Sequence, residues 1–248
     1  LLSISARPAQ GGVADARELD GSGSGTAPAQ TDSDSLKRKL VRLGTSRLYW
    51  ALTFAFVVCG VTTTGFMESH IVAFAEHKGM SAQHGAFVFG LLSAFNGIGI
   101  LGAGVLADRY HRVYLLASIF FVRALCYGAL LAVTKYWQLL LFGVFFGLAD
   151  YSVVPLVISL VAGYCGADVV GLGVGVLLLW HSVGAAAGSW MGGVAFDNAG
   201  DYDHAIWICL AACLAATSAL VFGGWGVDEQ WRRRSEVPAG TAKDDEKP

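Results

Sequence analysis

The chain has 248 residues, a length that would accommodate one or two soluble domains. Hydrophobic residues make up 54% of the chain and charged residues only 15%, whereas a typical soluble domain carries about 25% charged residues. Together with a formal net charge of only −2, these proportions exclude an ordinary soluble enzyme, a disordered protein and a nucleic-acid-binding protein, and they favour a protein that crosses a membrane several times.

The first 46 residues differ in composition from the rest of the chain. The segment GSGSGTAPAQTDSDS is too poor in hydrophobic residues to bury an apolar core, and a run of basic residues follows it. We therefore expect residues 1–46 to form a flexible cytoplasmic linker with a basic end. The sequence starts at LLSIS without a Met, which favours a fragment of a longer protein.

Six long apolar stretches lie within residues 47–227. A helix needs about 20 apolar residues to cross a bilayer, whereas the strands of a membrane barrel alternate in polarity over about 10 residues. The stretches are continuously apolar and about twice that strand length, so the sequence predicts an all-α, polytopic membrane protein with six transmembrane helices. The expected spans are 48–70, 84–107, 113–134, 136–163, 169–196 and 204–226.

Lysines and arginines are distributed unequally between the two sides of these spans. With the linker in the cytoplasm, ten of them flank the spans on that side, and only Lys78 and Lys135 flank the spans on the other. Because cytoplasmic loops are enriched in Lys and Arg, both ends of the chain are expected in the cytoplasm. Residues 228–248 then form a polar cytoplasmic tail.

The loop between the second and third spans carries the most specific motif of the chain. Its sequence, GVLADRYHR, resembles the G-x-L-a-D-R-x-G-R-R loop of the major facilitator superfamily. It departs from that pattern at His111, where the superfamily usually has Gly, and at Val113, where a second base is common. The positions that agree are Gly104, Leu106, Ala107, Asp108, Arg109 and Arg112.

The resemblance extends over residues 40–230. The stretches ESHIVAFAEHKGMSAQHGAFVFGLLSAFNGIGILGAGVLADR and GGVAFDNAGDYDHAIW are similar to the C-terminal half of monocarboxylate- or oxalate/formate-type carriers. This resemblance implies half of a twelve-helix carrier that works by alternating access in the plasma membrane. It also implies a small organic anion such as a monocarboxylate as substrate, and a proton or exchanged-anion gradient as driving force. The partner would be the missing N-terminal six-helix half, or alternatively a second copy of this chain.

The same motif suggests a cytoplasmic gate. Asp108 can lie near the positive N-terminal end of a neighbouring helix, and Arg109 and Arg112 can bind cytoplasmic carboxylates or lipid headgroups. Such contacts would hold the cytoplasmic side closed and break as the carrier changes state. The resemblance implies a partner for Asp108 in the other half, and Gly104 belongs to the same gating motif. The alternative is an ordinary positively charged cytoplasmic loop.

Several polar residues fall near the middle of the predicted spans. A charge at the bilayer centre costs roughly 2.5–3.5 kcal/mol on insertion scales, so it requires a partner or a wet cavity. Arg123 and Asp150 fall at similar depth in the third and fourth spans and could pair directly. Asn96 and His181 lie midway through the second and fifth spans, and secondary carriers place their substrate at this level. Asp150, Arg123, His181 and Asn96 are therefore candidates for substrate binding or coupling.

Each of these candidates has a structural alternative. Arg123 and Asp150 could form a structural ion pair, although the superfamily resemblance, in which the fourth span of a half faces the cavity, favours Asp150 over Arg123 as a direct ligand. His181 could join two helices by a hydrogen bond or act as a protonation switch. Asn96 could be a hydrogen-bonding contact between helices.

Glu68 and His70 lie near the outer end of the predicted first span. In one interpretation they belong to an ordinary solvated rim. In the other they form an outer gate or a group through which protons reach the interior of the protein.

Motifs typical of enzymes, metal sites and nucleotide sites are missing from the sequence. It contains no G-x-S-x-G, H-E-x-x-H or G-x-x-x-x-G-K-[ST] pattern, and its five cysteines include no C-x-x-C pair. We therefore expect no enzymatic activity, no cofactor, no metal and no nucleic-acid partner. The expected partners are the lipid bilayer, a small anion and protons. The alternative function is that of a transport-inactive six-span protein, either truncated or a regulatory or scaffold subunit.

Overall fold

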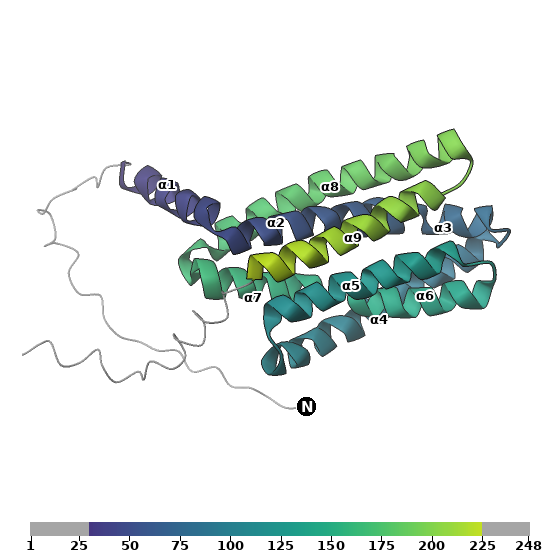
Figure 1. Cartoon of the computed structure of the whole chain (residues 1–248), viewed down its shortest axis with the longest axis horizontal. Helices are drawn as coiled ribbons and strands as arrows, with labels where there is room; N and C mark the ends of the chain where they lie inside the picture. The colour runs from purple at the N-terminus through teal and green to yellow at the C-terminus, as the bar shows by residue number, and fades with distance from the viewer. Residues whose placement is uncertain (1–29, 225–248) are drawn as a thin grey trace, which may run out of the picture. The chain divides into compact units, whose positions relative to one another are not determined.

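The computed structural model describes residues 30–224 (Figure 1). The chain divides into two compact units, Leu1–Lys37 and Arg38–Pro248. Of the first unit, the structure describes residues 30–37, which begin helix α1 (Gln30–Thr45). The second unit, described to residue 224, contains the end of that helix and the whole helical bundle.

Six helical segments of the second unit are long and apolar enough to cross a membrane. They are Arg47–His77, Ala82–Arg109, Arg112–Leu131, Tyr136–Cys165, Ala167–Ala199 and Asp203–Gly224. These segments overlap the six predicted spans, and residues 30–224 contain no strand. The prediction of an all-α membrane protein with six transmembrane helices is therefore confirmed.

Three of the six spans contain more than one helical element: the first and fourth are interrupted, and the fifth begins with a short 3-10 helix. The elements are α2 (Arg47–Gly60), the π-helix η1 (Val61–Met67), α3 (Glu68–His77), α4 (Ala82–Arg109), α5 (Arg112–Leu131), α6 (Tyr136–Ala149), α7 (Val153–Cys165), the 3-10 helix η2 (Ala167–Val169), α8 (Val170–Ala199) and α9 (Asp203–Gly224). The first span changes to a π-helix at its middle. The fourth span breaks between α6 and α7, where Pro155 accounts for the break because its ring clashes with the carbonyl of Tyr151, four residues earlier.

Local sequence explains where several helices begin and end. The hydroxyl of Ser46 accepts a hydrogen bond from the Tyr49 N–H (3.2 Å) and caps α2. The hydroxyl of Ser81 accepts one from the His84 N–H (3.3 Å) and caps α4. Gly200 ends α8 in the left-handed region (φ +74°), which glycine adopts without steric penalty.

The structure differs from the sequence expectations at two boundaries. The first span continues to His77, seven residues beyond the expected end, because the segment IVAFAEH contains no Gly or Pro and extends the helix. Within the predicted linker, residues 30–45 are helical, since Leu36, Leu40 and Leu43 recur at helical spacing among Lys and Arg, which favour helices. Residues 1–29 of the linker and the predicted tail 228–248 lie outside the described residues.

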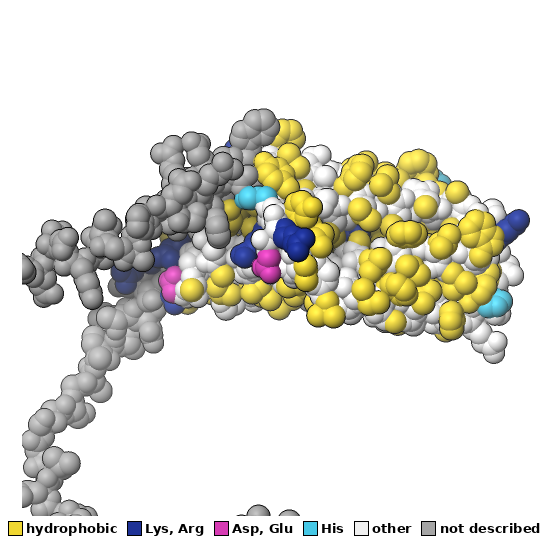
Figure 2. All heavy atoms as spheres, turned by 90° about the horizontal axis from the view of Figure 1, so that it is seen from below, with side chains coloured by type: hydrophobic (Ala, Val, Ile, Leu, Met, Phe, Trp, Pro, Cys, Tyr) yellow, Lys and Arg dark blue, Asp and Glu magenta, His cyan; other side chains and the backbone are white. Residues whose placement is uncertain are grey.

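The helices pack in close pairs around one apolar core. Helix α5 packs against α9, α4 against α6, and α2 with η1 against α8 (Figure 1). Over its most apolar 18 residues the first span is 72% buried. The corresponding parts of the second and fifth spans, which contain α4 and α8, are only 28% and 22% buried. Figure 2 shows hydrophobic side chains covering most of one flank of the protein, with charged side chains gathered toward its ends. The first span is thus the centre of the bundle, and α4 and α8 present apolar faces outward.

Glycines allow the first and fifth spans to approach closely. A Cβ atom on Gly188 would collide with the carbonyl of Val61, and one on Gly184 would collide with the carbonyl of Val57. A Cβ atom on Gly60 would likewise collide with the carbonyl of His181. Close backbone approach of this kind is a main source of helix association in lipid, where apolar burial contributes little. The contact holds η1 at a fixed place beside α8.

Replacing Gly188 with Ala should therefore destabilise the bundle by about 1–3 kcal/mol, because backbone must move to admit the methyl group. Gly193→Ala is the matched control, since its Cβ atom would enter open space on the same helix, where Ala favours the helix by up to about 1 kcal/mol. Thermal unfolding of the two variants in detergent measures the difference. Equal unfolding temperatures would show that the contact between α8 and η1 does not constrain the fold.

Candidate functional site

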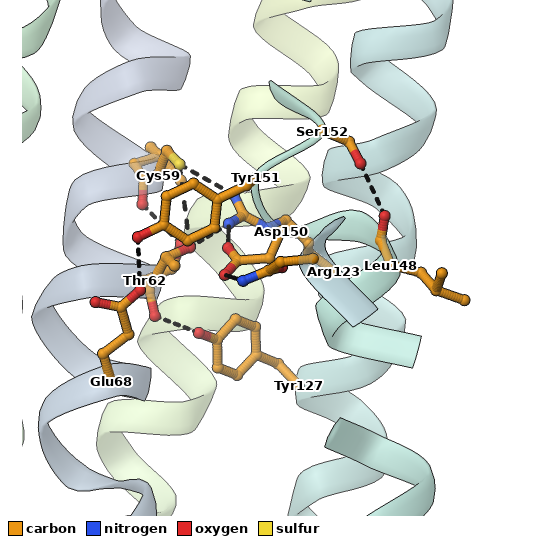
Figure 3. A network of polar contacts seen from close by, with 12 residues as sticks. Cys59, Thr62, Glu68, Arg123, Tyr127, Leu148, Asp150, Tyr151 and Ser152 are labelled. Atoms are coloured by element: carbon orange, nitrogen blue, oxygen red, sulfur yellow. Dashed lines mark hydrogen bonds and ion pairs between the residues drawn. The ribbon is translucent and has the colours of Figure 1, made fainter. Parts of the chain in front are cut away.

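A buried ion pair lies at the centre of the bundle. The guanidinium of Arg123 on α5 donates from Nη2 to Oδ1 of Asp150, which follows the last residue of α6 (Figure 3). The side chain of Arg123 is 0% exposed and that of Asp150 is 1% exposed. Each charge therefore has its neutralising partner inside the protein, as a charge at this depth requires.

The break in the fourth span presents the Asp150 carboxylate to this partner. Residues 150–152 separate α6 from α7, so the regular helix is interrupted at the carboxylate. On the α4 side, a Cβ atom on Gly99 would collide with the carbonyl of Leu148, and one on Gly147 would lie 3.1 Å from the Cα atom of Leu92. The two glycines thus let α4 and α6 approach closely in the turn of α6 that directly precedes Asp150.

Other groups complete the surroundings of Arg123. Its Nη1 lies 3.3 Å from Sγ of Cys59, and its Nη2 also donates to the hydroxyl of Thr63 in η1. The rings of Phe120 and Phe146 lie 5.4 Å and 5.5 Å from its guanidinium carbon, within the range of cation–π attraction. Its Nε atom is buried and has no hydrogen-bond partner among the described residues.

Asn96 on α4 contacts the second carboxylate oxygen of the pair. Its Nδ2 lies 3.4 Å from Oδ2 of Asp150, and its side chain is 8% exposed. Its Oδ1 is buried and accepts no hydrogen bond from any described residue. The structure thus brings together three of the four candidate residues, from three different spans.

The π-helix η1 provides the other polar groups of this cluster. Thr62 and Thr63 are buried in it, and the hydroxyl of Tyr127 donates to the Thr62 carbonyl. Short π-helical stretches within α-helices are rare and occur frequently at functional sites. Neither Cys59 nor Tyr127 was among the candidate residues, because nothing in the sequence of a single span shows which of its residues face Arg123.

Glu68 lies deeper in the protein than the sequence indicated. The first span continues for nine residues beyond it, so this half-buried carboxylate is not at the outer end of the helix. The hydroxyl of Tyr151 donates to its Oε1 over 3.1 Å, and Figure 3 shows Tyr151 pointing toward Glu68. Since Tyr151 directly follows Asp150, this contact connects Glu68 to the site. Tyr151 was not among the candidate residues, and its position next to Asp150 is the sequence signal that could have identified it.

His181 and His70 lie outside the ion-pair contacts. The His181 ring is half-buried beside the ring of Phe56 (5.4 Å between centroids), and it interacts electrostatically with Arg123, Glu68 and Asp150. Nε2 of His70 lies 3.0 Å from the carbonyl of Ser189 on α8. His181 thus borders the polar cluster, whereas His70 joins the first span to the fifth.

The loop motif forms a separate region at one end of the bundle. Gly104, Asp108 and Arg109 are exposed at the end of α4, and Arg112 begins α5. Together with residues of α7, Asp108, Arg109 and Arg112 line a hollow of about 340 Å³. Among residues 30–224, Asp108 forms no ion pair. The structure therefore does not bring the gating candidates together with Arg123 and Asp150.

The residues that the structure describes do not include a group of three or more His, Cys, Asp or Glu side chains that could hold a metal ion. The five cysteines are all buried and unpaired by disulfides. The charged and polar groups brought together at the site can pair as ions, form hydrogen bonds and exchange protons.

Comparison with known proteins agrees with this combination of six spans and a buried polar site. Residues 51–246 match the Major Facilitator Superfamily, a family of multi-pass membrane transporters, and the chain belongs to this family. It is 31% identical over 142 residues to "MFS transporter asaE" of Aspergillus flavus, covering 55% of this chain and 31% of that protein. It is 30% identical over 177 residues to the "Uncharacterized MFS-type transporter YcxA" of Bacillus subtilis, covering 66% of this chain and 41% of that protein. The matched regions thus span between about a third and two fifths of these relatives.

Removing one member of the buried pair should destabilise the protein more than removing both. Arg123→Met or Asp150→Leu alone leaves a buried charge without a partner, which costs about 3–5 kcal/mol, whereas the double variant leaves none. A double-mutant cycle of unfolding free energies in detergent measures this coupling. The control is Asp168→Asn, which removes a pair with Arg42 that is about half exposed and contributes at most about 1 kcal/mol. Additive effects of the two core substitutions would contradict the pairing.

Proposed function

We propose that this chain forms one six-helix half of a secondary active transporter that carries a small organic anion, such as a monocarboxylate, together with a proton. The other half is an N-terminal six-helix unit or a second copy of this chain, and transport proceeds by alternating access between the halves. The observation that supports this proposal most directly is the buried one-to-one pairing of Arg123 with Asp150.

The charge balance of this pair explains how a proton and an anion are coupled. The pair is neutral as it stands, and protonating Asp150 leaves the buried guanidinium of Arg123 with an uncompensated positive charge. An anion restores neutrality, so each ligand strengthens the binding of the other. An uncompensated charge at the bilayer centre costs roughly 2.5–3.5 kcal/mol, which corresponds to a coupling of about a hundredfold.

The geometry of Arg123 supports a carboxylate as the anion. Its Nε and Nη2 atoms share one edge of the guanidinium plane, and this edge can donate two parallel hydrogen bonds to a carboxylate. In the structure, Nη2 donates to Asp150 and Thr63, while Nε has no partner among the described residues. Protonation of Asp150 weakens the contact to Nη2 and makes the edge available to the substrate.

Glu68 provides the route by which a proton reaches the pair. Asp150 is almost fully buried, whereas Glu68 is half-buried and Tyr151 is exposed. The hydrogen bond between Tyr151 and Glu68 places an accessible carboxylate against the residue that directly follows Asp150. In this proposal Glu68 exchanges protons with the substrate cavity between the two halves. His181, which borders the polar cluster, influences the charge state of Glu68.

The loop motif acts as the cytoplasmic gate in this proposal. Asp108 and Arg109 are exposed and thus available to a partner in the other half, and Arg112 holds the start of α5 beside them. Asp108→Asn should slow transport without changing the amount of folded protein, because the closed cytoplasmic state loses a contact. An unchanged transport rate would contradict the gate. The excess of Lys and Arg on this side supports cytoplasmic ends, and we propose the plasma membrane as the location.

The proposal predicts saturable uptake of a labelled small carboxylate into proteoliposomes, accelerated by a pH gradient that is acidic outside. Asp150→Asn cannot take up a proton and should lose this acceleration while still exchanging one anion for another. Asp168→Asn, which removes an exposed carboxylate far along the chain from the site, should retain both activities.

Two outcomes would contradict the proposal. Uptake that is independent of the pH gradient in the wild type would indicate anion exchange without protons. Absence of uptake by folded protein in which this chain is combined with its other half would favour the transport-inactive, regulatory or scaffold function.

A further inference from the structure

The amide of Asn96 contacts the carboxylate of Asp150 through its donor atom and leaves its acceptor atom unused. Nδ2 lies 3.4 Å from Oδ2 of Asp150, while Oδ1 is buried without a partner among the described residues. Buried polar atoms normally have a hydrogen-bond partner, so an unpaired acceptor at this place requires an explanation. The residue is only 8% exposed and Oδ1 itself is buried, so the surrounding protein shields this acceptor from bulk water.

We infer that Asn96 is a positioning residue for proton coupling: its Oδ1 accepts the hydrogen bond of Asp150 when that carboxyl is protonated. This inference rests on the proposed function, because it assigns a role to Asn96 in the protonation step. In the ionised state Asn96 donates to Asp150, as the structure shows, and in the protonated state the direction of the hydrogen bond reverses.

The chemistry of the neighbouring groups leaves Asn96 as the acceptor. A protonated carboxyl carries one O–H donor, and Arg123 has no acceptor atom to receive it. The hydroxyl of Thr63 already accepts from Arg123. Among the described residues, the oxygens of Asp150 form side-chain hydrogen bonds with Arg123 and Asn96 alone, and Asn96 is the partner that has an acceptor.

The protonation step is balanced without a further reactant. A hydronium ion gives its proton to Oδ2 of Asp150, an O–H bond forms, and water remains. The Asn96 amide then turns about its terminal torsion, which is broad and roughly two-fold, and presents Oδ1 to the new O–H group. The amide thus offers Asp150 one hydrogen bond in each state, as a donor to the ionised carboxylate and as an acceptor from the protonated carboxyl.

Close packing keeps the amide at this place. Asn96 lies one helical turn before Gly99 on α4, where a Cβ atom would collide with the carbonyl of Leu148. On α6, a Cβ atom on Gly147 would lie 3.1 Å from the Cα atom of Leu92, one turn earlier on α4. These contacts on both sides of Asn96 fix its distance from Asp150 and leave rotation of the amide as its principal freedom.

Several titratable or charged groups from other helices act on the same carboxyl. Those that interact electrostatically with Asp150 are Glu68, Arg123, Tyr127, Tyr151 and His181, and Cys59 and Cys213 interact with Arg123. The direction of the hydrogen bond between Asp150 and Asn96 is a separate property, so the test measures this hydrogen bond directly.

Infrared difference spectra of the purified full chain, recorded between neutral and acidic pH, report the carbonyl band of protonated Asp150, identified by its loss in Asp150→Asn. In the wild type this band should have the lowered wavenumber of an acid whose O–H group donates a hydrogen bond. Asn96→Ala should shift it to the higher wavenumber of a free acid, and should reduce proton-driven uptake roughly tenfold, as expected for a lost hydrogen bond at a charged site. Asn96→Ser, whose hydroxyl both donates and accepts, should restore part of each effect.

Ser93→Ala is the matched control, because Ser93 is exposed on the same helix and its hydroxyl donates to the Phe89 carbonyl. It should change neither the band nor the uptake. A band that stays in place in folded Asn96→Ala, with proton-driven uptake intact, overturns the role of Asn96 and leaves the proposed function standing. Absence of any Asp150 band at acidic pH overturns the proposed function and this inference with it.

Discussion

A guanidinium at the centre of a membrane-spanning bundle must be neutralised inside the protein, and much of this structure is arranged around that requirement. Arg123 is fully buried, and the break between α6 and α7 presents the Asp150 carboxylate to it. The π-helix η1 places the Thr63 hydroxyl against the same guanidinium, and the glycine contacts with α8 hold η1 in position. The two interrupted spans are therefore those that supply partners to this charge.

The neutrality of the pair connects the fold to the proposed transport. A neutral pair can remain in the low-dielectric interior, and it can accept a proton and an anion together without acquiring net charge. Binding either ligand alone leaves a charge unpaired and is disfavoured by the same free energy that required the pair. Nε of Arg123 and Oδ1 of Asn96, which have no hydrogen-bond partner within residues 30–224, are the atoms that would gain partners when both ligands are bound.

The sequence predicted the fold better than it predicted the site. Continuous apolar runs identify six spans because each crosses the bilayer independently of its neighbours, and equal depth in adjacent spans indicated that Arg123 and Asp150 could pair. The lateral order of the helices is not encoded in any single span, so Cys59 and Tyr127 were not recognised as neighbours of the pair. Glu68 was expected at the outer end, because the mixed polarity of residues 71–77 conceals the continuation of the helix.

The most direct test of the central claim is to measure proton uptake by the purified full-length protein when the anion binds, in a weakly buffered detergent solution with a pH indicator. About one proton should be taken up for each carboxylate bound, and none in Asp150→Asn, because the proton and the anion bind to the two members of one pair. Anion binding to the wild type without proton uptake would show that the buried pair does not couple the two ligands.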